Sequence, residues 1–130
     1  MPGIQKLLSD FLGGEMNQEK IEGLLKLFPY DSSIITDEMI EDRMQILPLM
    51  NPQVLASMKI PNLEDDLDKI THPMLVFWGM DDKFCPVSGA SKIGQKCHDA
   101  QIILFSRCGH WVMIEREEIF NQTCIDFLNR

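Results

Sequence analysis

Apolar residues in the first half of the chain recur at the spacing of a helix face. Four such faces are found, at residues 4–12, 17–28, 36–47 and 52–58. The second includes Phe28 and is ended by Pro29, and Asn17 and Thr36 stand where side chains can cap the second and third helices. The faces are rich in methionine and too wide for four short helices to bury alone. We therefore expect residues 1–67 to form a helical lid (cap) segment over another layer.

The second half of the chain changes to short, continuously apolar runs. Residues 74–78 and 100–105 have the pattern of strands that are buried on both faces of a parallel sheet. A helix capped by Ser88 joins them as a right-handed βαβ unit, and a last helix begins near Glu115. Two strands alone leave faces and edges uncovered. We expect residues 68–130 to be an α/β segment whose sheet is incomplete, preceded by a loop at 61–65.

Length and charge limit the classes of function. The 130 residues, 45% of them apolar, suffice for one compact domain, and no apolar run reaches the roughly 20 residues of a membrane span. The N-terminus shows no export signal. A net charge of −8 disfavours nucleic acid, whose phosphates attract Lys and Arg clusters. We expect a cytoplasmic protein with neither nucleic-acid nor membrane partners.

The four cysteines show no metal-binding spacing. Cys85, Cys97, Cys108 and Cys124 are separated by 12, 11 and 16 positions, without a C-x-x-C or H-x-x-x-H pattern. We expect free thiols, no metal and no cofactor. Cys97 and Cys124 are expected to be buried as small apolar residues of helices, and Cys108 is expected to pack closely rather than to act as a nucleophile.

Residues that could take part in catalysis follow each of the two predicted strands. The turn Gly-Met-Asp-Asp at 79–82 comes after the first, and Cys-Gly-His-Trp at 108–111 comes after the second. Ligands of open parallel sheets bind beyond the carboxyl ends of the strands. A carboxylate there can accept a hydrogen bond from Nδ1 of His110 and stabilise the imidazolium that forms when Nε2 takes a proton. We predict Asp82 and His110 to be catalytic; a turn-forming acid and a backbone-capping histidine are the simpler alternatives.

Residues 78–86 (Trp-Gly-Met-Asp-Asp-Lys-Phe-Cys-Pro) and 105–111 (Phe-Ser-Arg-Cys-Gly-His-Trp) resemble the C-terminal half of the meta-cleavage-product hydrolases. These are α/β-hydrolases that cleave carbon–carbon bonds in ring-opened products of aromatic and steroid-ring catabolism. Residues 28–33 and 41–43 resemble part of the lid of that family. The resemblance implies the C-terminal portion of an α/β-hydrolase fold, with a helical lid segment followed by β-α-β-α.

The resemblance also assigns roles to individual residues. The family acid stands three residues after a glycine and four before a proline, which selects Asp82 over Asp81. Arg43 matches the lid arginine that approaches the substrate carboxylate, a role for which a guanidinium fork is well suited. Trp111 matches a pocket-lining tryptophan. The simpler alternatives are a surface charge for Arg43 and core packing for Trp111.

The nucleophile of a Ser-Asp-His triad is missing from this chain. No Gly-x-Ser-x-Gly occurs, and the nearest approach, at 89–94, follows Asp82, whereas this fold orders its triad Ser, Asp, His. We therefore expect a fragment of a hydrolase of small-molecule dienoates that is inactive alone and forms homo-oligomers through its strand edges. The alternatives are a non-catalytic half-domain that oligomerises or binds a partner, and a fragment of a carboxylesterase of the same fold.

Overall fold

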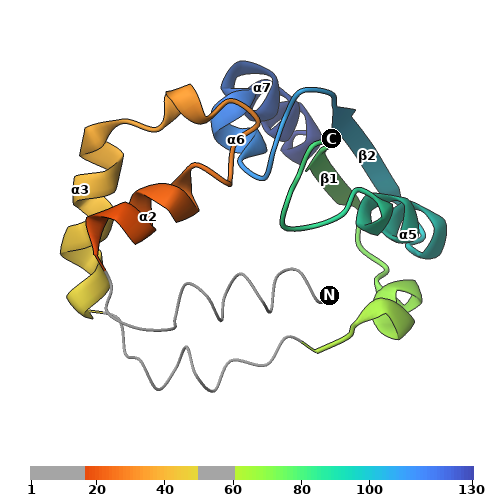
Figure 1. Cartoon of the computed structure of the whole chain (residues 1–130). Helices are drawn as coiled ribbons and strands as arrows, with labels where there is room; N and C mark the ends of the chain where they lie inside the picture. Colours follow the sequence, from red (N-terminus) through yellow and green to blue (C-terminus); the bar gives the residue numbers. More distant parts are fainter. Residues whose placement is uncertain (1–16, 50–60) are drawn as a thin grey trace. The chain divides into compact units, whose positions relative to one another are not determined.

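The computed structural model describes residues 17–49 and 61–130 (Figure 1). They belong to two compact units. The first lies within Met1–Leu27 and Ser32–Pro61, and the second consists of Phe28–Asp31 and Asn62–Arg130. The helices predicted at 4–12 and 52–58 lie outside the described residues.

The described residues of the first unit include two α-helices that begin at the predicted caps. They are α2 (Gln18–Leu25) and α3 (Asp37–Ile46), accompanied by 3-10 turns at Ser32–Ile34 and Leu47–Leu49. The side chain of Asn17 accepts a hydrogen bond from the amide of Lys20 at 3.0 Å. Thr36 Oγ1 accepts one from the amide of Met39 at 3.2 Å. Both cap predictions are confirmed, because each side chain satisfies an amide that the first helical turn leaves without a partner.

The second helix is shorter than its apolar pattern predicted. It ends at Leu25, with Lys26 as the C-cap, so assigning Phe28 to its face was wrong. A residue before proline is disfavoured in helical conformation, which explains why the chain leaves the helix here. Phe28 belongs to the second unit, where its ring stacks on other aromatic rings.

The second unit is built on a two-stranded parallel sheet. Strands β1 (Met74–Gly79) and β2 (Ala100–Phe105) pair in register from Met74–Ala100 to Gly79–Phe105. Helix α5 (Ser88–Lys96) connects them. Both predicted strands and their parallel pairing are therefore confirmed, and the two strands end at the same edge of the sheet.

Helices cover both faces of this sheet. Consecutive strand residues point to opposite faces. Trp78 lies against Gly89 of α5, and the ring of Phe77 lies 4.7 Å from that of Phe120 on α7 (Glu117–Leu128). A short helix, α6 (Val112–Glu115), precedes α7. Helical structure thus begins at Val112, ahead of the start predicted near Glu115.

Three local predictions are corrected. Ser88 is the first residue of α5 and not its cap; Val87 holds that position without a side-chain hydrogen bond. A 3-10 helix (Glu64–Lys69) begins within the predicted loop at 61–65 and takes up its last two residues. Residues 74–78 are half-buried instead of buried on both faces, because within the described residues β1 pairs with a single other strand and is packed mainly against the helices α5, α6 and α7.

The cysteines are free thiols, as predicted. Cys97 is buried, whereas Cys124 is only half-buried, contrary to the prediction. Cys124 lies on the side of α7 that faces the incompletely covered sheet, where it lines an open groove. Within the described part of the chain, no helix is both long and apolar enough to cross a bilayer.

Candidate active site

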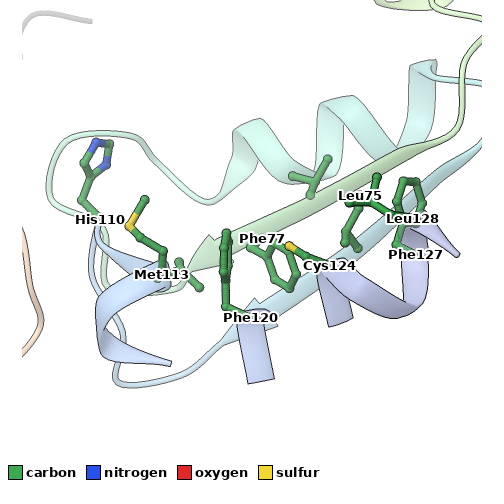
Figure 2. Close-up of a pocket in the computed structure, with 10 residues that line it drawn as sticks. Leu75, Phe77, His110, Met113, Phe120, Cys124, Phe127 and Leu128 are labelled. Carbon is green, nitrogen blue, oxygen red and sulfur yellow. The ribbon is translucent and has the colours of Figure 1, made fainter. Parts of the chain in front are cut away.

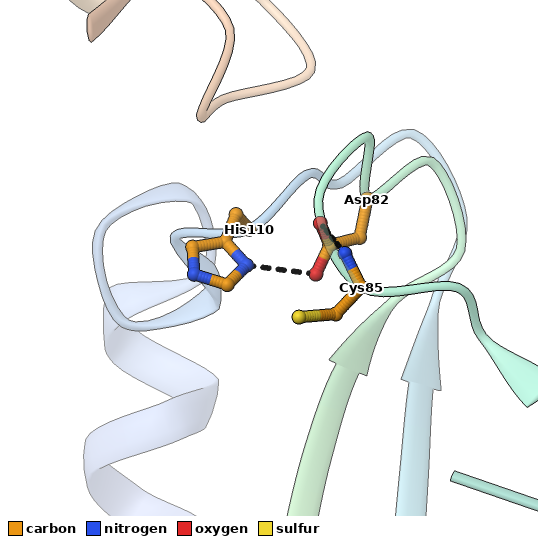
Figure 3. Close-up of side chains that lie close together, drawn as sticks. All are labelled: Asp82, Cys85 and His110. Carbon is orange, nitrogen blue, oxygen red and sulfur yellow. Dashed lines mark hydrogen bonds and ion pairs between the residues drawn. The ribbon is translucent and has the colours of Figure 1, made fainter. Parts of the chain in front are cut away.

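Asp82 and His110 meet beyond the carboxyl ends of the two strands (Figure 3). Asp82 lies in the turn after β1, and its Oδ2 is 2.9 Å from His110 Nδ1. Its Oδ1 accepts hydrogen bonds from the amides of Phe84 at 2.8 Å and Cys85 at 2.9 Å. The Asp82 side chain is 6% exposed and that of His110 is 35% exposed. The carboxylate is therefore fixed by backbone donors, while the imidazole can still be reached from solvent.

The neighbouring carboxylate has a different partner. Asp81 Oδ2 accepts a hydrogen bond from the amide of Arg107 at 2.9 Å, in the turn that follows β2. Arg107 has a φ of 54°, in the left-handed region that side chains rarely adopt. Asp81 therefore links the two turns to each other, and of the two aspartates it is Asp82 that bonds to the imidazole.

Two glycines allow the site's turns to approach closely. A Cβ on Gly79 would overlap the carbonyl oxygen of Gly109, and a Cβ on Gly109 would overlap that of Phe28. The amide of His110 donates to the carbonyl of Phe28 at 2.7 Å. The backbone of His110 is thus held between the end of β1 and the segment Phe28–Asp31.

Glu115 fixes the same turn from the other side. Its Oε1 accepts from the amide of Gly109 at 2.9 Å, and its Oε2 accepts from the amide of Tyr30 at 2.8 Å. The guanidinium of the adjacent Arg116 donates to the carbonyls of Ser106 at 3.1 Å and Arg107 at 2.8 Å. The sequence did not indicate that Glu115 positions this turn. An acidic residue near a helix start is already explained by its favourable interaction with the helix dipole.

Aromatic side chains pack beside the imidazole. The ring of Phe28 stacks on Phe84 at 4.5 Å and on Trp111 at 4.8 Å, with an interplanar angle of 2° to Trp111. Its centroid lies 5.6 Å from that of His110. Trp111 thus packs against Phe28 in this structure, and a contact with substrate remains a prediction for it. Arg43 lies on α3 in the first unit, where its backbone carbonyl accepts from the amide of Leu47.

Neither cysteine of the two turns has the environment of an activated thiol. Burial raises the pKa of Cys108 to about 11, and the nearby Glu115 carboxylate adds to this effect. Cys108 is fully buried. Burial, followed by the charge of Asp82, also raises the pKa of Cys85. The thiolate is the nucleophilic form, so the prediction that Cys108 serves packing agrees with its surroundings.

Two cavities adjoin the pair. The smaller, of about 160 Å³, lies at the end of β1 and is lined by Phe77, Trp78, Gly79, Asp82, Cys85, His110 and Val112. The larger is an apolar groove of about 500 Å³ that runs from His110 along β1 and α7 (Figure 2). It is lined by Leu75, Val76, Phe77, His110, Val112, Met113, Phe120, Cys124, Phe127 and Leu128. An apolar compound that occupied the groove would reach the imidazole at one end.

No family model matches the chain, but comparison with known proteins finds similar hydrolases. The chain is 34% identical to the 2-hydroxy-6-oxo-6-phenylhexa-2,4-dienoate hydrolase of Burkholderia cepacia, over 98% of its own length and 47% of that protein. It is equally similar, with the same coverage, to the 2-hydroxy-6-oxononadienedioate/2-hydroxy-6-oxononatrienedioate hydrolase of Comamonas testosteroni. The chain thus spans about half the length of the curated relatives it matches.

A solved structure shows the same relationship in three dimensions. The meta-cleavage product hydrolase CumD of Pseudomonas fluorescens superposes with a TM-score of 0.79 and 27% identity, over 95% of this chain and 50% of that one. The parallel strands, the helices on both faces and the Asp–His pair define this chain as a partial α/β-hydrolase fold. Within that class, and over about half of their length, the chain is similar to the meta-cleavage product hydrolases.

Proposed function

We propose that this chain supplies the acid–base pair of a hydrolase that cleaves carbon–carbon bonds in ring-opened, vinylogous dienoates. The observation that carries the proposal is the 2.9 Å contact between His110 Nδ1 and Asp82 Oδ2 on the turns after two parallel strands. Its relatives are named as hydrolases of such dienoates. The Ser nucleophile and the oxyanion donors would come from a part of the fold outside these 130 residues, so the chain alone is inactive in this proposal.

The contact assigns a proton position to the imidazole. An ionised carboxylate only accepts hydrogen bonds, so a bond from His110 to Asp82 requires the proton on Nδ1. Nε2 then carries a lone pair and can take a proton from a serine hydroxyl or from water. Asp82 stabilises the imidazolium that results, and the proton is later returned to the leaving carbon.

Two further residues are proposed to bind substrate. Arg43 would pair with the dienoate carboxylate, because its planar fork of donors matches the two oxygens. Trp111 would line the pocket beside the imidazole. A fragment of a carboxylesterase would share Asp82 and His110 but would have less need of a cation at position 43, so Arg43 distinguishes the two chemistries.

The test is a chimera in which this chain replaces the aligned region of the Burkholderia cepacia relative. We expect the chimera to bleach the conjugated dienoate, and we expect His110→Ala to lower kcat by roughly a thousandfold or more. The matched control is His98→Ala, at an exposed histidine that follows α5. A folded chimera without dienoate turnover, or a His110→Ala variant of undiminished activity, contradicts the proposal.

The same chimera separates the dienoate hydrolase from the esterase. Arg43→Ala is expected to lower kcat/KM at least tenfold for dienoates and to change it little for neutral p-nitrophenyl esters, because only the dienoate carries a carboxylate. An equal loss of kcat/KM on both substrates would contradict the assignment of Arg43 to binding of the substrate carboxylate.

A second candidate function is a non-catalytic module that associates through its sheet. The apolar groove along β1 and α7 favours this reading, since such surfaces are ordinarily covered by another chain or segment. In this alternative, the Asp82–His110 contact would be a remnant that fixes the turns.

A further inference from the structure

A third potential ligand lies beside the Asp82–His110 contact. One ligand atom each of Asp82, Cys85 and His110 lies within 4.8 Å of the other two. Figure 3 shows the sulfur of Cys85 directed toward the space beside the bond between the carboxylate and the imidazole. The three residues come from two turns that are separated in sequence, so the cysteine spacing could not predict this cluster.

The chemical character of the cluster suits one class of ion. Zn²⁺ binds thiolate sulfur, imidazole nitrogen and carboxylate oxygen at roughly 2.0–2.3 Å, and its ligands in a tetrahedral site lie about 3.6 Å apart. Small side-chain rotations would bring atoms within 4.8 Å to that separation. A thiolate ligand also selects zinc over magnesium and calcium, which prefer oxygen.

The surroundings of the cluster already orient one ligand. The backbone amides of Phe84 and Cys85 hold Asp82 Oδ1, so Oδ2 points toward His110. Hydrogen bonds of this kind to a ligating carboxylate support metal affinity in known sites. The indole Nε1 of Trp78 donates to the carbonyl of Cys85 at 3.0 Å, which fixes the backbone that carries the thiol.

We propose that Asp82, Cys85 and His110 form a zinc site whose occupation replaces the hydrogen bond between Asp82 and His110. The ion would be held by Asp82 Oδ2, Cys85 Sγ and His110 Nδ1, and a water molecule would complete the tetrahedron. The thiol proton is released to solvent when the sulfur binds. The proton that Nδ1 carried is transferred through solvent to Nε2, so the imidazole remains neutral.

Zinc at this position would inhibit the acid–base pair. With the proton on Nε2, His110 can donate there but cannot accept a proton. This consequence for turnover rests on the proposed function, whereas binding of the ion does not. Measuring zinc binding therefore tests the site itself, and its outcome does not depend on whether the proposed function is correct.

Binding is tested on the untagged chain by calorimetry with Zn²⁺ and by absorption with Co²⁺ as the probe. We expect one ion per chain and a thiolate-to-cobalt charge-transfer band in the near ultraviolet. Cys85→Ser should abolish that band and weaken zinc affinity at least about tenfold. His110→Gln should weaken the affinity while retaining the band. Cys124→Ser, at a half-buried thiol outside the cluster, should leave both unchanged.

Several results would overturn the zinc site. A charge-transfer band that persists in Cys85→Ser, or that disappears in Cys124→Ser, would place the ion elsewhere. Loss of zinc binding on His98→Ala would indicate adventitious binding at an exposed histidine. Circular dichroism of each variant distinguishes loss of a ligand from loss of folding, and an unaltered zinc affinity in a folded His110→Gln variant contradicts the proposal.

Discussion

At the scale of single residues, two adjacent aspartates have separate roles because their turns give them different partners. Asp82 is nearly buried and contacts His110, whereas the exposed Asp81 accepts from the amide of Arg107. The family pattern around Gly79 and Pro86 points to Asp82, and the expected contact with His110 is present. Cys85 could not be assigned to this cluster from sequence, because its proximity to His110 depends on how the two turns meet.

The environment of Cys108 makes the stability of the chain sensitive to alkaline pH. Its pKa rises from about 9 to about 11 on folding, so the unfolded chain ionises first. The contribution of this thiol is fully present below pH 9 and is lost as the pH rises to about 11. The expected loss is about 2 to 3 kcal/mol in the free energy of unfolding.

Urea denaturation between pH 8 and 11 measures this effect. Cys108→Ala should be less stable at pH 8 but should show a smaller decrease with pH. Cys124→Ala is the control for general alkaline destabilisation and should retain the full decrease. Parallel pH profiles for the wild type and Cys108→Ala would show that this thiol is not responsible.

At the scale of secondary-structure elements, the strands and caps could be predicted because their signals are local. The apolar runs of β1 and β2 and the caps Asn17 and Thr36 each depend on a few neighbouring residues. Phe28 could not be placed in this way. Its helical spacing suggested α2, but its position is determined by stacking on Phe84 and Trp111, which lie far along the chain.

Glu115 bonds to the amide of Tyr30, which lies 85 residues earlier in the sequence, and also to the amide of Gly109. Its loss should loosen the turn that carries His110. Glu115→Gln keeps one acceptor oxygen but cannot accept from both Tyr30 and Gly109. We expect a decrease of about 1 kcal/mol in the free energy of unfolding, measured by urea denaturation at pH 7.

The control for this prediction is Glu118→Gln, at an exposed position in the first turn of α7. It should change the free energy of unfolding by only a few tenths of a kcal/mol, as exposed charges near a helix start ordinarily do. Equal effects of the two substitutions would mean that the hydrogen bonds of Glu115 contribute nothing specific.

At the scale of the whole molecule, the sheet is the feature that remains incomplete. Within the described residues, β1 pairs only with β2, and an apolar groove of about 500 Å³ runs beside it. The chain also spans about half of its curated relatives. The sequence predicted an incomplete sheet because two fully apolar strands need more cover than this chain offers. It could not predict which segment covers them, since that depends on tertiary packing and not on a local pattern of residues.

We expect the isolated chain to associate through this groove. Light scattering coupled to size exclusion should give a mass above the 15.0 kDa of one chain at micromolar concentration. Met113→Lys places a charge in the groove and should shift the mass toward the monomer. Met80→Lys, at an equally exposed methionine that does not line the groove, is the matched control. A stable wild-type monomer would contradict the expectation.

The most direct test of the Asp82–His110 pair is the protonation state of the imidazole itself. Long-range ¹H–¹⁵N correlation spectra of the chain at neutral pH report which ring nitrogen of His110 carries the proton. A hydrogen bond to Asp82 predicts the Nδ1–H form for His110, the reverse of the form that free histidine favours in water, and Asp82→Ala should abolish this preference while Asp81→Ala keeps it. A His110 protonated on Nε2 in the metal-free chain would contradict the account.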